Sequence, residues 1–514
     1  MNIGLFIGNK QKINKMAANF DRTDRVSIFK YSAGLIDHCL REFANEEEIL
    51  HLPAGDKGKL GKLVEYLYFK YPINNNPEAD FAEAGMELKC TGLRNGIREE
   101  YLIKERLVCG MINYMEVVNE SFETSHFYQK CLVMLLLFYL YKKGTNLLDA
   151  KFLFSVLWKL PEKDLIIIRR DYETIVNKIR AGQAHNLSEG DTVYLGACRK
   201  GQKGDALRTQ PFSEIKAKGR AFSLKPAYMR TVLKYVLDSG QPAICNFDDI
   251  DLNKQLVSVK ELKKSSFENI LLSRFGRYYG LNSFQIFKKM RQKPSFGKDK
   301  YFDSSNAIAG KGLVSNVNKS EEFEKSGIML KAIRVEQNGR IEQAMSFENI
   351  DWQEVFECDE WEDSRLYEIF SNRFMFVVYR NTGHPINVRV YRNWLKEKNA
   401  ERKAKGKYLY KLEDSYELER VFFWTMPQED LELAREYWTD IKRQVQADNI
   451  KVGQFWKIGD DKKFHVRPKG QLSKFKDVSP VTGEKTADQL CYWFNANYVK
   501  DIIKDSVELE NGLS

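Results

Sequence analysis

Hydrophobic and polar positions along the chain predict both helices and strands. Apolar residues recur at helical spacing within 58-GKLGKLVEYLYFK-70: Leu60, Leu63, Val64 and Leu67. The next segment, 71-YPINNNPEAD-80, has two prolines and three asparagines and predicts a turn. After it, 84-AGMELKCTGL-93 alternates apolar and polar residues as a strand does. Residues 1–50 have a partly helical pattern.

Three further segments extend this mixture of elements. The apolar run 131–141 is too short to span a membrane and predicts a buried strand or helix. A strand is predicted for 152–160, and 164–182 predicts a strand that leads into a helix ended by Gly182. Residues 239–310 are more polar and predict a connector with some helix, followed by a second globular unit.

Length and charge limit the interpretation without deciding it. A chain of 514 residues with 43% hydrophobic content favours two domains with real cores. The net charge of +10 permits an anionic partner such as nucleic acid, but it is equally typical of a basic soluble protein. Eight scattered cysteines without a CxxC pair argue against zinc and disulfides and indicate a reducing cytoplasm. The N-terminus lacks the order of a signal peptide, so we expect a cytoplasmic protein.

Basic residues concentrate between residues 199 and 234. This segment has ten lysines and arginines, two acids and interleaved aromatic residues at Phe212, Phe222 and Tyr228. That composition is typical of a nucleic-acid contact surface, and the alternative is a solvated basic face.

The most informative stretch is 79-ADFAEAGMELKCTGL-93, which carries Asp80, Glu87 and Lys89. On a strand, Glu87 and Lys89 project from the same side, and Asp80 can fold back beside them from the preceding turn. Two carboxylates at one site repel each other unless a cation lies between them, and Mg²⁺ prefers such oxygen ligands. Lys89 could orient or deprotonate an attacking water, or offset charge on a phosphate. A charged strand edge is the alternative, because this short motif is common by chance.

Neighbouring residues strengthen the catalytic interpretation. Glu65, on the predicted helix, can add a third carboxylate, and Lys130 comes at the start of the apolar run. For His126 we favour a structural role over that of a general base.

These segments resemble the MutH family, which comprises the mismatch-repair endonuclease MutH and the Sau-type restriction endonucleases. The resemblance rests on GKLVE, ADFAEAGMELK, FETSHFYQK, YLGACRKG (194–201) and RAFSLKPAYM (220–229). It implies the PD-(D/E)xK nuclease fold, an α/β fold with a mixed sheet flanked by helices. It also implies that Asp80, Glu87 and Lys89 form the catalytic triad, that Glu65 is an additional carboxylate near the metal, and that Lys130 is a further active-site lysine.

The resemblance also implies residues that contact DNA. Lys200 matches a lysine of the family's recognition loop, and the run 208–225 is similar to the restriction branch. Candidate DNA contacts there are Arg208, Lys216, Lys218 and Lys225; lysine or arginine to guanine is the commonest specific pairing. Ser223 replaces a tyrosine that senses adenine methylation in MutH, so we expect cutting that tolerates this methylation.

The second half of the chain echoes the first. The segment 322-EFEKSGIMLK-331 matches 80-DFAEAGMELK-89, with Glu322 at the Asp80 position and Met329 in place of Glu87. A thioether is a poor ligand for a hard cation. Similar echoes follow in order at 361–365, 464–470 and 493–499, although a chance match is the alternative. We therefore expect a duplicated MutH-like domain that has lost its metal site and binds DNA, with Arg467 and Lys469 as possible contacts.

The resemblance implies a bacterial type II restriction endonuclease. Its expected parts are a catalytic domain over 1–240 with a core from about 50, a connector over 241–310 and a degenerate DNA-binding, allosteric domain over 311–514. It would use Mg²⁺ to cut double-stranded DNA at or near 5′-GATC-3′. Two chains would meet on the DNA, and a cognate methyltransferase would belong to the same system. The alternatives are a MutH-like nicking endonuclease of mismatch repair and a sequence-specific DNA-binding protein that does not cut.

Overall fold

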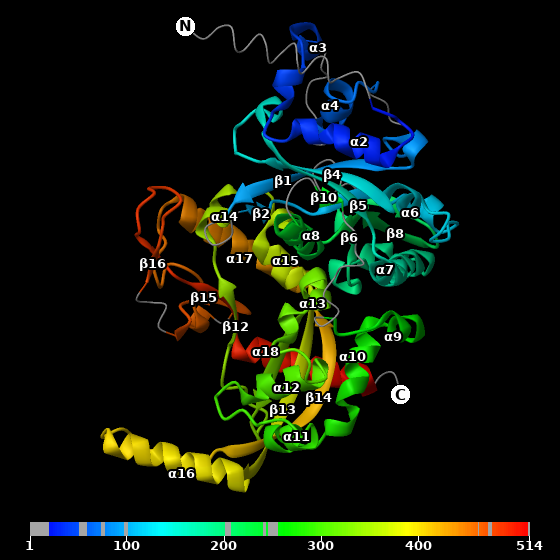
Figure 1. The fold of residues 1–514 in the computed structure, drawn as a ribbon. Helices are drawn as coiled ribbons and strands as arrows, with labels where there is room; N and C mark the ends of the chain where they lie inside the picture. Colours follow the sequence, from blue (N-terminus) through cyan, green and yellow to red (C-terminus); the bar gives the residue numbers. More distant parts are fainter. Residues whose placement is uncertain are drawn as a thin grey trace. The chain divides into compact units, whose positions relative to one another are not determined.

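The computed structural model describes residues 20–50, 59–72, 78–96, 101–200, 207–239, 243–244, 255–460, 462–470 and 475–511. The chain forms two compact units, Met1–Asp251 and Leu252–Ser514. In Figure 1 the first unit runs from blue to green and the second from green to red. Each unit has its own sheets and its own core.

The main sheet of the first unit is mixed, with the strand order β10-β5-β4-β1-β2. Its strands are β1 (Glu87–Asn95), β2 (Tyr101–Ile103), β4 (Val133–Leu140), β5 (Phe152–Lys159) and β10 (Ala243–Ile244). β1 runs parallel to β4, with Glu87 opposite Met134. β2 and β5 are antiparallel to their neighbours β1 and β4. β4 is apolar along its whole length and lies at the centre, where both faces are buried.

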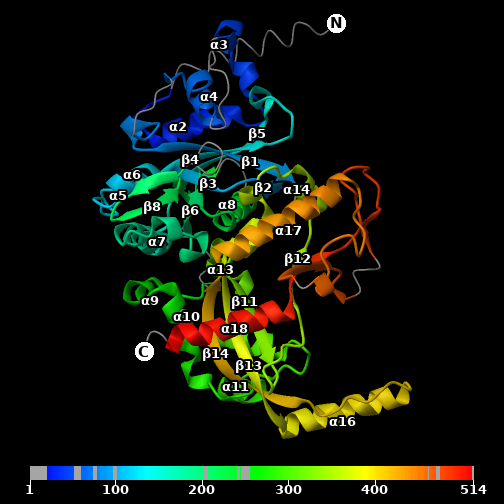
Figure 2. The ribbon, with the colours of Figure 1, turned by 180° about the vertical axis from the view of Figure 1, so that it is seen from behind.

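Helices cover both faces of this sheet. Figures 1 and 2 show α2 (Arg25–Ser32) and α4 (Lys59–Leu67) on one face and α7 (Glu162–Arg180) and α8 (Pro226–Ser239) on the other. The short helix α3 (Glu46–Leu50) lies near α4. Leu63 and Val64 of α4 pack with Leu88 of β1 and Leu135 of β4 in one apolar cluster. This packing fixes α4 beside the start of β1, where the charged residues of the site begin.

A smaller sheet completes the first unit. Its order is β3 (Leu107–Met111), β9 (Arg220–Leu224), β6 (Leu195–Arg199), all antiparallel. A hairpin of β7 (Leu207–Gln210) and β8 (Ser213–Lys218) precedes β9. Among the described residues of this unit, the remaining helices apart from 3-10 turns are α5 (Tyr114–Val117) and α6 (His126–Cys131).

Most elements predicted from the sequence are confirmed. The helix in 58–70 is α4, the strands in 84–93 and 152–160 are β1 and β5, and the apolar run is strand β4. The strand predicted at the start of 164–182 is wrong, because α7 begins at Glu162, directly after Pro161, and is helical throughout. Its isoleucine run resembles a buried strand, but Ile168, Ile175 and Ile179 share one buried helical face. The predicted turn lies partly outside the described residues, at 73–77.

The second unit has two three-stranded sheets. One has the order β11 (Met329–Val335), β13 (Arg373–Pro385), β14 (Asp414–Thr425), and the other has the order β12 (Met345–Asn349), β18 (Cys491–Phe494), β15 (Phe464–Arg467). A two-stranded ribbon is formed by β16 (Lys476–Asp477) and β17 (Ala487–Asp488). An aromatic-rich core joins both larger sheets to α14 (Trp352–Glu357), α15 (Arg365–Ser371), α17 (Gln428–Gln446) and α18 (Ala496–Asn511).

The order of elements in the second unit follows that of the first. α6, β4, β5 and α7 have counterparts in α15, β13, β14 and α17, and β11 runs parallel to β13 as β1 does to β4. Both short helices have serine N-caps, Ser125 and Ser364. One difference is α16 (Arg389–Ala404), which lies between β13 and β14 and extends away from the sheet in Figures 1 and 2.

The segment expected to be a connector is largely helical. Within 255–310, α9 (Val259–Lys264), α10 (Phe267–Phe275), α11 (Ser283–Lys289) and α12 (Lys300–Ala309) belong to the second unit, and α13 (Glu321–Ser326) leads into β11. The mixed α/β class is confirmed. Among the described residues, no helix is long and apolar enough to cross a membrane, and the seven described cysteines are free thiols.

Candidate active site

Asp80, Glu87 and Lys89 meet at the start of β1. Lys89 Nζ donates to Glu87 Oε1 at 2.7 Å. The backbone N–H of Asp80 lies 3.3 Å from Glu87 Oε2, and the N–H of Leu88 donates to Asp80 Oδ2 at 2.9 Å. Glu87 is almost fully buried, with 2% of its surface exposed. The predicted triad is therefore one hydrogen-bonded group.

A tight loop explains the six-residue spacing between Asp80 and Glu87. The backbones of Phe81 and Met86 exchange two hydrogen bonds, at 3.0 and 3.2 Å, around a 3-10 turn at Ala82–Ala84. Gly85 ends that turn with a φ of 57°, a left-handed conformation that glycine adopts without steric cost. Phe81 and Met86 are fully buried and anchor the loop to the core. The loop thereby returns the chain so that Asp80 lies beside Glu87.

The structure brings Lys130 and Glu65 to the same place. Lys130, in α6 rather than in the strand that follows, has its Nζ 3.5 Å from Glu87 Oε1. Glu65 lies in the last turns of α4 and is partly buried. His126 is mostly exposed and pairs with Glu120 at 2.7 Å, which agrees with the structural role favoured from the sequence.

Burial and repulsion by neighbouring carboxyl groups raise the pKa values of Glu65 and Asp80. Burial, followed by the charges of Asp80 and Glu87, raises the pKa of Glu65 to about 7. Burial and then the charge of Glu87 also raise the pKa of Asp80. The pKa of Lys89 is raised, because the attraction of Glu87 outweighs the effect of burial. Excess negative charge is thus concentrated here and only partly balanced by two lysines.

This donor set suits a hard divalent cation. Asp80, Glu87 and Glu65 offer only carboxylate oxygens, and their repulsion would be relieved by a cation between them. In the part of the chain that the structure describes, no group of three or more His, Cys, Asp or Glu side chains is arranged so that it could hold a metal ion. Asp80 and Glu87 are the residues that fit such an ion best, with Glu65 adjacent.

Several predicted DNA contacts gather on the β7–β8 hairpin and the adjoining edge of the smaller sheet. Arg208 and Lys216 are exposed, and Lys218 is partly exposed. Lys200 is also exposed, and its N–H donates to the carbonyl of Gly219 at 2.9 Å. A Cβ on Gly219 would lie 2.7 Å from the carbonyl oxygen of Lys200 and 3.1 Å from Arg208 Nε, so glycine permits this close approach. The result is a basic surface formed by the hairpin and by Lys200, which precedes it.

Two other predicted contacts are buried. Ser223 is completely inaccessible in the central strand β9, opposite Gly196. Lys225 is 1% exposed, and its Nζ donates to the carbonyl of Thr192 at 2.7 Å. Its charge also acts on Asp171, whose carboxylate accepts the N–H groups of 193–195. Burial nevertheless raises the pKa of Asp171 to about 6.

An ion pair between Arg106 and Glu189 was not predicted from the sequence. Both side chains are buried, and they connect the segment before β3 to the turn before β6. Glu189 lies beside Gly196 and Ser223, because a Cβ on Gly196 would lie within 3.8 Å of both side chains. The partners are 83 positions apart, and neither belongs to a recognisable motif, so no local pattern could reveal the pair.

In the second unit, Arg467 ends β15 and Lys469 follows it on the surface. The Arg467 guanidinium lies over the Trp493 ring, 4.1 Å from its centroid. Asn318, which the sequence did not single out, accepts the N–H of Leu330 at 2.7 Å. This bond matches the one that Asp80 accepts from Leu88 at 2.9 Å in the first unit.

Comparison with known proteins finds a nuclease family over the segment that contains these residues. The family described as "DNA mismatch repair enzyme MutH" matches residues 69–171, which include Asp80, Glu87, Lys89 and Lys130. The chain is 29% identical to the type II restriction enzyme Sau3AI of Staphylococcus aureus over 513 residues, covering 89% of this chain and 96% of the relative. It is 26% identical to the DNA mismatch repair protein MutH of Vibrio vulnificus (strain YJ016) over 204 residues, covering 39% of this chain and 87% of that protein.

Proposed function

Because the chain belongs to the MutH family and is a site-specific endonuclease acting on double-stranded DNA, we propose that it is a restriction enzyme that cuts both strands at or near 5′-GATC-3′. The observation that carries the proposal is the hydrogen-bonded group of Asp80, Glu87 and Lys89, with Lys130 beside it. The near full-length similarity to a type II restriction enzyme supports the restriction role over the repair role.

In this proposal the acidic residues bind the metal and the lysines act on the phosphodiester. Asp80 and Glu87, with Glu65 beside them, would hold Mg²⁺. When bound, the ion supplies Lewis-acid stabilisation of the phosphate and lowers the pKa of a water. A carboxylic acid must lose its proton before it can act as a ligand. Because the pKa of Glu65 is raised, metal binding by Glu65 should depend on pH near neutrality.

Lys89 acts as a positive charge beside Glu87. While Lys89 donates to Glu87 Oε1, its pKa is raised and it remains an ammonium. As an ammonium it can orient the attacking water or offset the charge that builds on the phosphate. Lys130, 3.5 Å from the same oxygen, supplies a second positive charge against the phosphate. Both lysines therefore act where negative charge increases during hydrolysis.

DNA recognition would use the basic surface around the hairpin. Lys200 and Arg208 are accessible, and Lys216 and Lys218 extend this surface along β8. Phosphate contacts position a duplex, while contacts to base edges provide specificity. Cutting would tolerate adenine methylation, because Ser223 stands where the family's methylation-sensing tyrosine is found.

The second unit would be a duplicated domain that binds DNA without cutting it. The repeated order of elements and the match between Asn318 and Asp80 support this origin. A chain with one catalytic site must cooperate with a second chain to cut both strands of a palindromic sequence. The second unit would bind another copy of the site and activate the first. A methyltransferase of the same system would protect the host.

The test is a plasmid digest with wild type and Glu87→Ala. Plasmids with no, one or two GATC sites, with and without adenine methylation, are incubated in Mg²⁺ or in EDTA. Linear products with GATC ends, absent in EDTA and in the variant, are expected from both methylation states. Glu83→Gln is a matched control, since Glu83 is an exposed carboxylate of the same loop. Nicking alone would favour the mismatch-repair role, and binding without cleavage would refute the proposal.

A further inference from the structure

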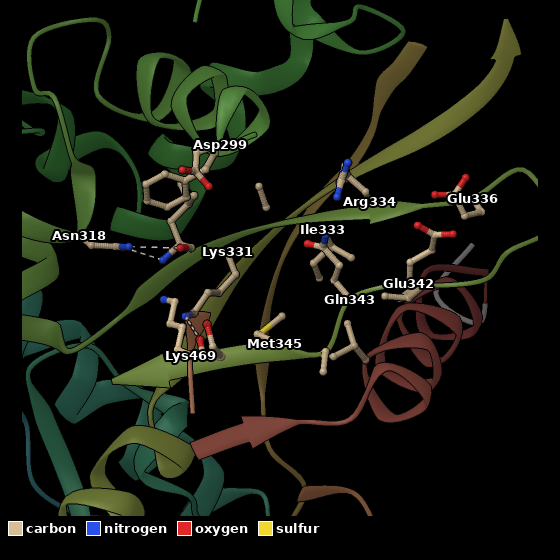
Figure 3. Close-up of a pocket in the computed structure, with 17 residues that line it drawn as sticks. Asp299, Asn318, Lys331, Ile333, Arg334, Glu336, Glu342, Gln343, Met345 and Lys469 are labelled. Carbon is tan, nitrogen blue, oxygen red and sulfur yellow. Dashed lines mark hydrogen bonds between the residues drawn. The ribbon is translucent and has the colours of Figure 1, made fainter. Parts of the chain in front are cut away.

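A cavity of about 370 Å³ opens beside β11 in the second unit. Figure 3 shows Lys331 and Lys469 pointing toward one another at one end, near Met345. Asn318 and Ser346 also line this end. All of the lining residues belong to the second unit. They come from β11, β12 and the loop between these strands, from the first turn of α12 and the residue before it, from the 3-10 turn that contains Asn318, from the segment after β15 and from α18.

Among the described residues, no ion pair joins either lysine to a carboxylate. The charge of Glu348 does act on Lys331, but the Glu348 carboxylate accepts hydrogen bonds from Arg365 at 2.6 and 2.8 Å. Lys331 is partly buried, and its Nζ donates to the carbonyl of Ser346 at 2.8 Å. The same Nζ lies 4.8 Å from the centroid of the Phe347 ring. Burial, followed by the positive charge of Lys469, lowers the pKa of Lys331 to about 8. Lys469 is exposed at the edge of the cavity.

This end of the cavity corresponds to the catalytic site of the first unit. Asn318 accepts the N–H of Leu330 as Asp80 accepts that of Leu88. Met329 and Lys331 flank Leu330 on β11, as Glu87 and Lys89 flank Leu88 on β1.

Glu322, which the sequence alignment placed at the Asp80 position, lies elsewhere in the structure. It is fully buried and accepts the N–H groups of Leu256 and Val257 at distances between 2.9 and 3.1 Å. The sequence match paired the glycine and leucine residues of the two segments and so placed Glu322 opposite Asp80. In the structure, the residue that accepts the N–H of Leu330 is Asn318, four residues before Glu322.

These replacements reverse the charge of the site. In the first unit, Asp80, Glu87 and Glu65 form a group of three acids that Lys89 and Lys130 only partly balance. In the second unit two neutral residues, Asn318 and Met329, take the places of the two acids. Lys331 remains on the strand, and Lys469 lies beside it. The charge of this lysine pair has the sign that attracts an anion and repels a cation.

Acidic residues also line the cavity, but they lie away from the lysine pair. Figure 3 shows Glu336 and Glu342 at the opposite end and Asp299 across the β11 ribbon from Lys469. Glu336 is already engaged, because it accepts hydrogen bonds from Asn381 at 2.8 Å and from the Tyr416 hydroxyl at 2.5 Å. The anion-binding character is therefore confined to the end that contains Lys331 and Lys469.

We propose that the Lys331–Lys469 end of this cavity binds a backbone phosphate of duplex DNA. This inference rests on the proposed DNA binding by the second unit and names the group that the unit holds. Lysine is a compact point charge that is well suited to a phosphate. Arg467, two residues before Lys469, extends the positive charge from the cavity along the same segment. The lysine that serves catalysis in the first unit would here serve only binding.

The experiment measures duplex binding by the full-length chain in metal-free buffer, where cleavage is prevented. Titration calorimetry gives the number of GATC duplexes bound per chain and the affinity of each. We expect two duplexes for wild type and a loss of about tenfold or more for one of them in Lys331→Gln and in Lys469→Gln. The slope of log affinity against log salt should fall by about one for each lysine removed. Lys288→Gln, which changes an exposed lysine of α11 outside the cavity, should leave both duplexes unchanged.

A second variant tests the charge without removing either lysine. The double substitution Asn318→Asp and Met329→Glu restores the two acids and keeps an acceptor for the Leu330 N–H. It should weaken the same duplex, while circular dichroism and the melting temperature verify that the chain remains folded.

The possible failures are distinguishable. If wild type binds only one duplex, DNA binding by the second unit fails, and this inference fails with it. If wild type binds two duplexes and all cavity variants bind both with unchanged affinity and salt dependence, only this inference is overturned. Chemical acetylation of Lys331, followed by mass spectrometry, separates the sources of phosphate. Protection by duplex supports the proposal, and protection by inorganic phosphate or a mononucleotide but not by duplex overturns it.

Discussion

Lys89 donates a 2.7 Å hydrogen bond to Oε1 of Glu87, two residues before it on the same face of β1. Lys130 lies farther from that oxygen, at 3.5 Å. We predict that Lys89→Met lowers the rate of single-turnover cleavage by about 10²- to 10³-fold, the range for removal of one group that stabilises developing charge. Lys130→Met should have a smaller effect, because its contact is longer. Rapid-quench measurements on a GATC duplex give both rates.

Duplex affinity is the control for these two variants. Neither substitution should change affinity as much as rate, since both lysines act mainly on charge that develops during the reaction. A Lys89→Met enzyme with wild-type cleavage would contradict the role assigned to Lys89. A rate loss fully explained by weaker binding would contradict it as well.

Glu65 should make the site sensitive to pH near neutrality. Its pKa is raised from the ordinary value of 4.5 to about 7, first by burial and then by Asp80 and Glu87. Between these values the unfolded chain loses the proton while the folded chain keeps it. Without metal, the free energy of unfolding should therefore fall as pH rises from about 4.5 to 7, by at most about 1.4 kcal/mol per pH unit. Chemical denaturation at several pH values measures this slope.

Metal binding should show the opposite dependence on pH, because the ligand is the ionised carboxylate. Affinity for Mg²⁺ should increase as pH rises through about 7. In Glu65→Gln, both the stability slope and this inflection in affinity should be reduced. The exposed residue Glu83, changed to Gln, serves as the control. An unchanged pH profile in Glu65→Gln would show that another group titrates.

The sequence predicted the local parts of the site better than its long-range parts. Asp80, Glu87 and Lys89 lie within ten residues, and one loop and one strand fix their geometry. The Arg106–Glu189 pair depends on how distant segments pack, which no local pattern encodes. Asn318 was missed for a related reason, because the alignment matched Glu322, whereas the structure forms the equivalent hydrogen bond from a different loop.

Variants of Lys200 and Lys225 should separate an effect on DNA binding from an effect on stability. Lys200 is exposed, whereas Lys225 is 1% exposed and bound to the carbonyl of Thr192. We predict that Lys200→Ala weakens duplex binding and lowers its salt dependence without changing the melting temperature. Lys225→Met should lower the melting temperature, because the Thr192 carbonyl loses a charged donor and Asp171 loses a nearby positive charge. Anisotropy and calorimetric scans of both variants make the comparison, and the reverse pattern would refute it.

Removing one partner of the buried pair of Arg106 and Glu189 should destabilise the first unit more than removing both. Removing one partner leaves the other charge buried and unpaired, which costs about 3–5 kcal/mol. We predict that Glu189→Ala destabilises the first unit by this amount. The double variant Arg106→Met, Glu189→Leu should be less destabilised than either single variant, because no unpaired charge remains. Urea denaturation of the three variants measures the coupling, and additive losses would show that the pair does not act as a unit.

Ser223 connects the proposed tolerance of methylation to the packing of the smaller sheet. Its side chain is fully buried in β9, beside Gly196 and Glu189. A tyrosine at this position would need space that the adjacent strands occupy, and overpacking of this kind costs about 1–3 kcal/mol or more. We predict that Ser223→Tyr lowers the melting temperature and does not create discrimination against methyladenine by itself. Ser223→Ala, which removes only the hydroxyl, is the matched control and should retain stability and equal cleavage of methylated and unmethylated GATC plasmid. A stable Ser223→Tyr enzyme that cuts only unmethylated plasmid would instead show that the strand shifts and that this single residue determines sensitivity to methylation.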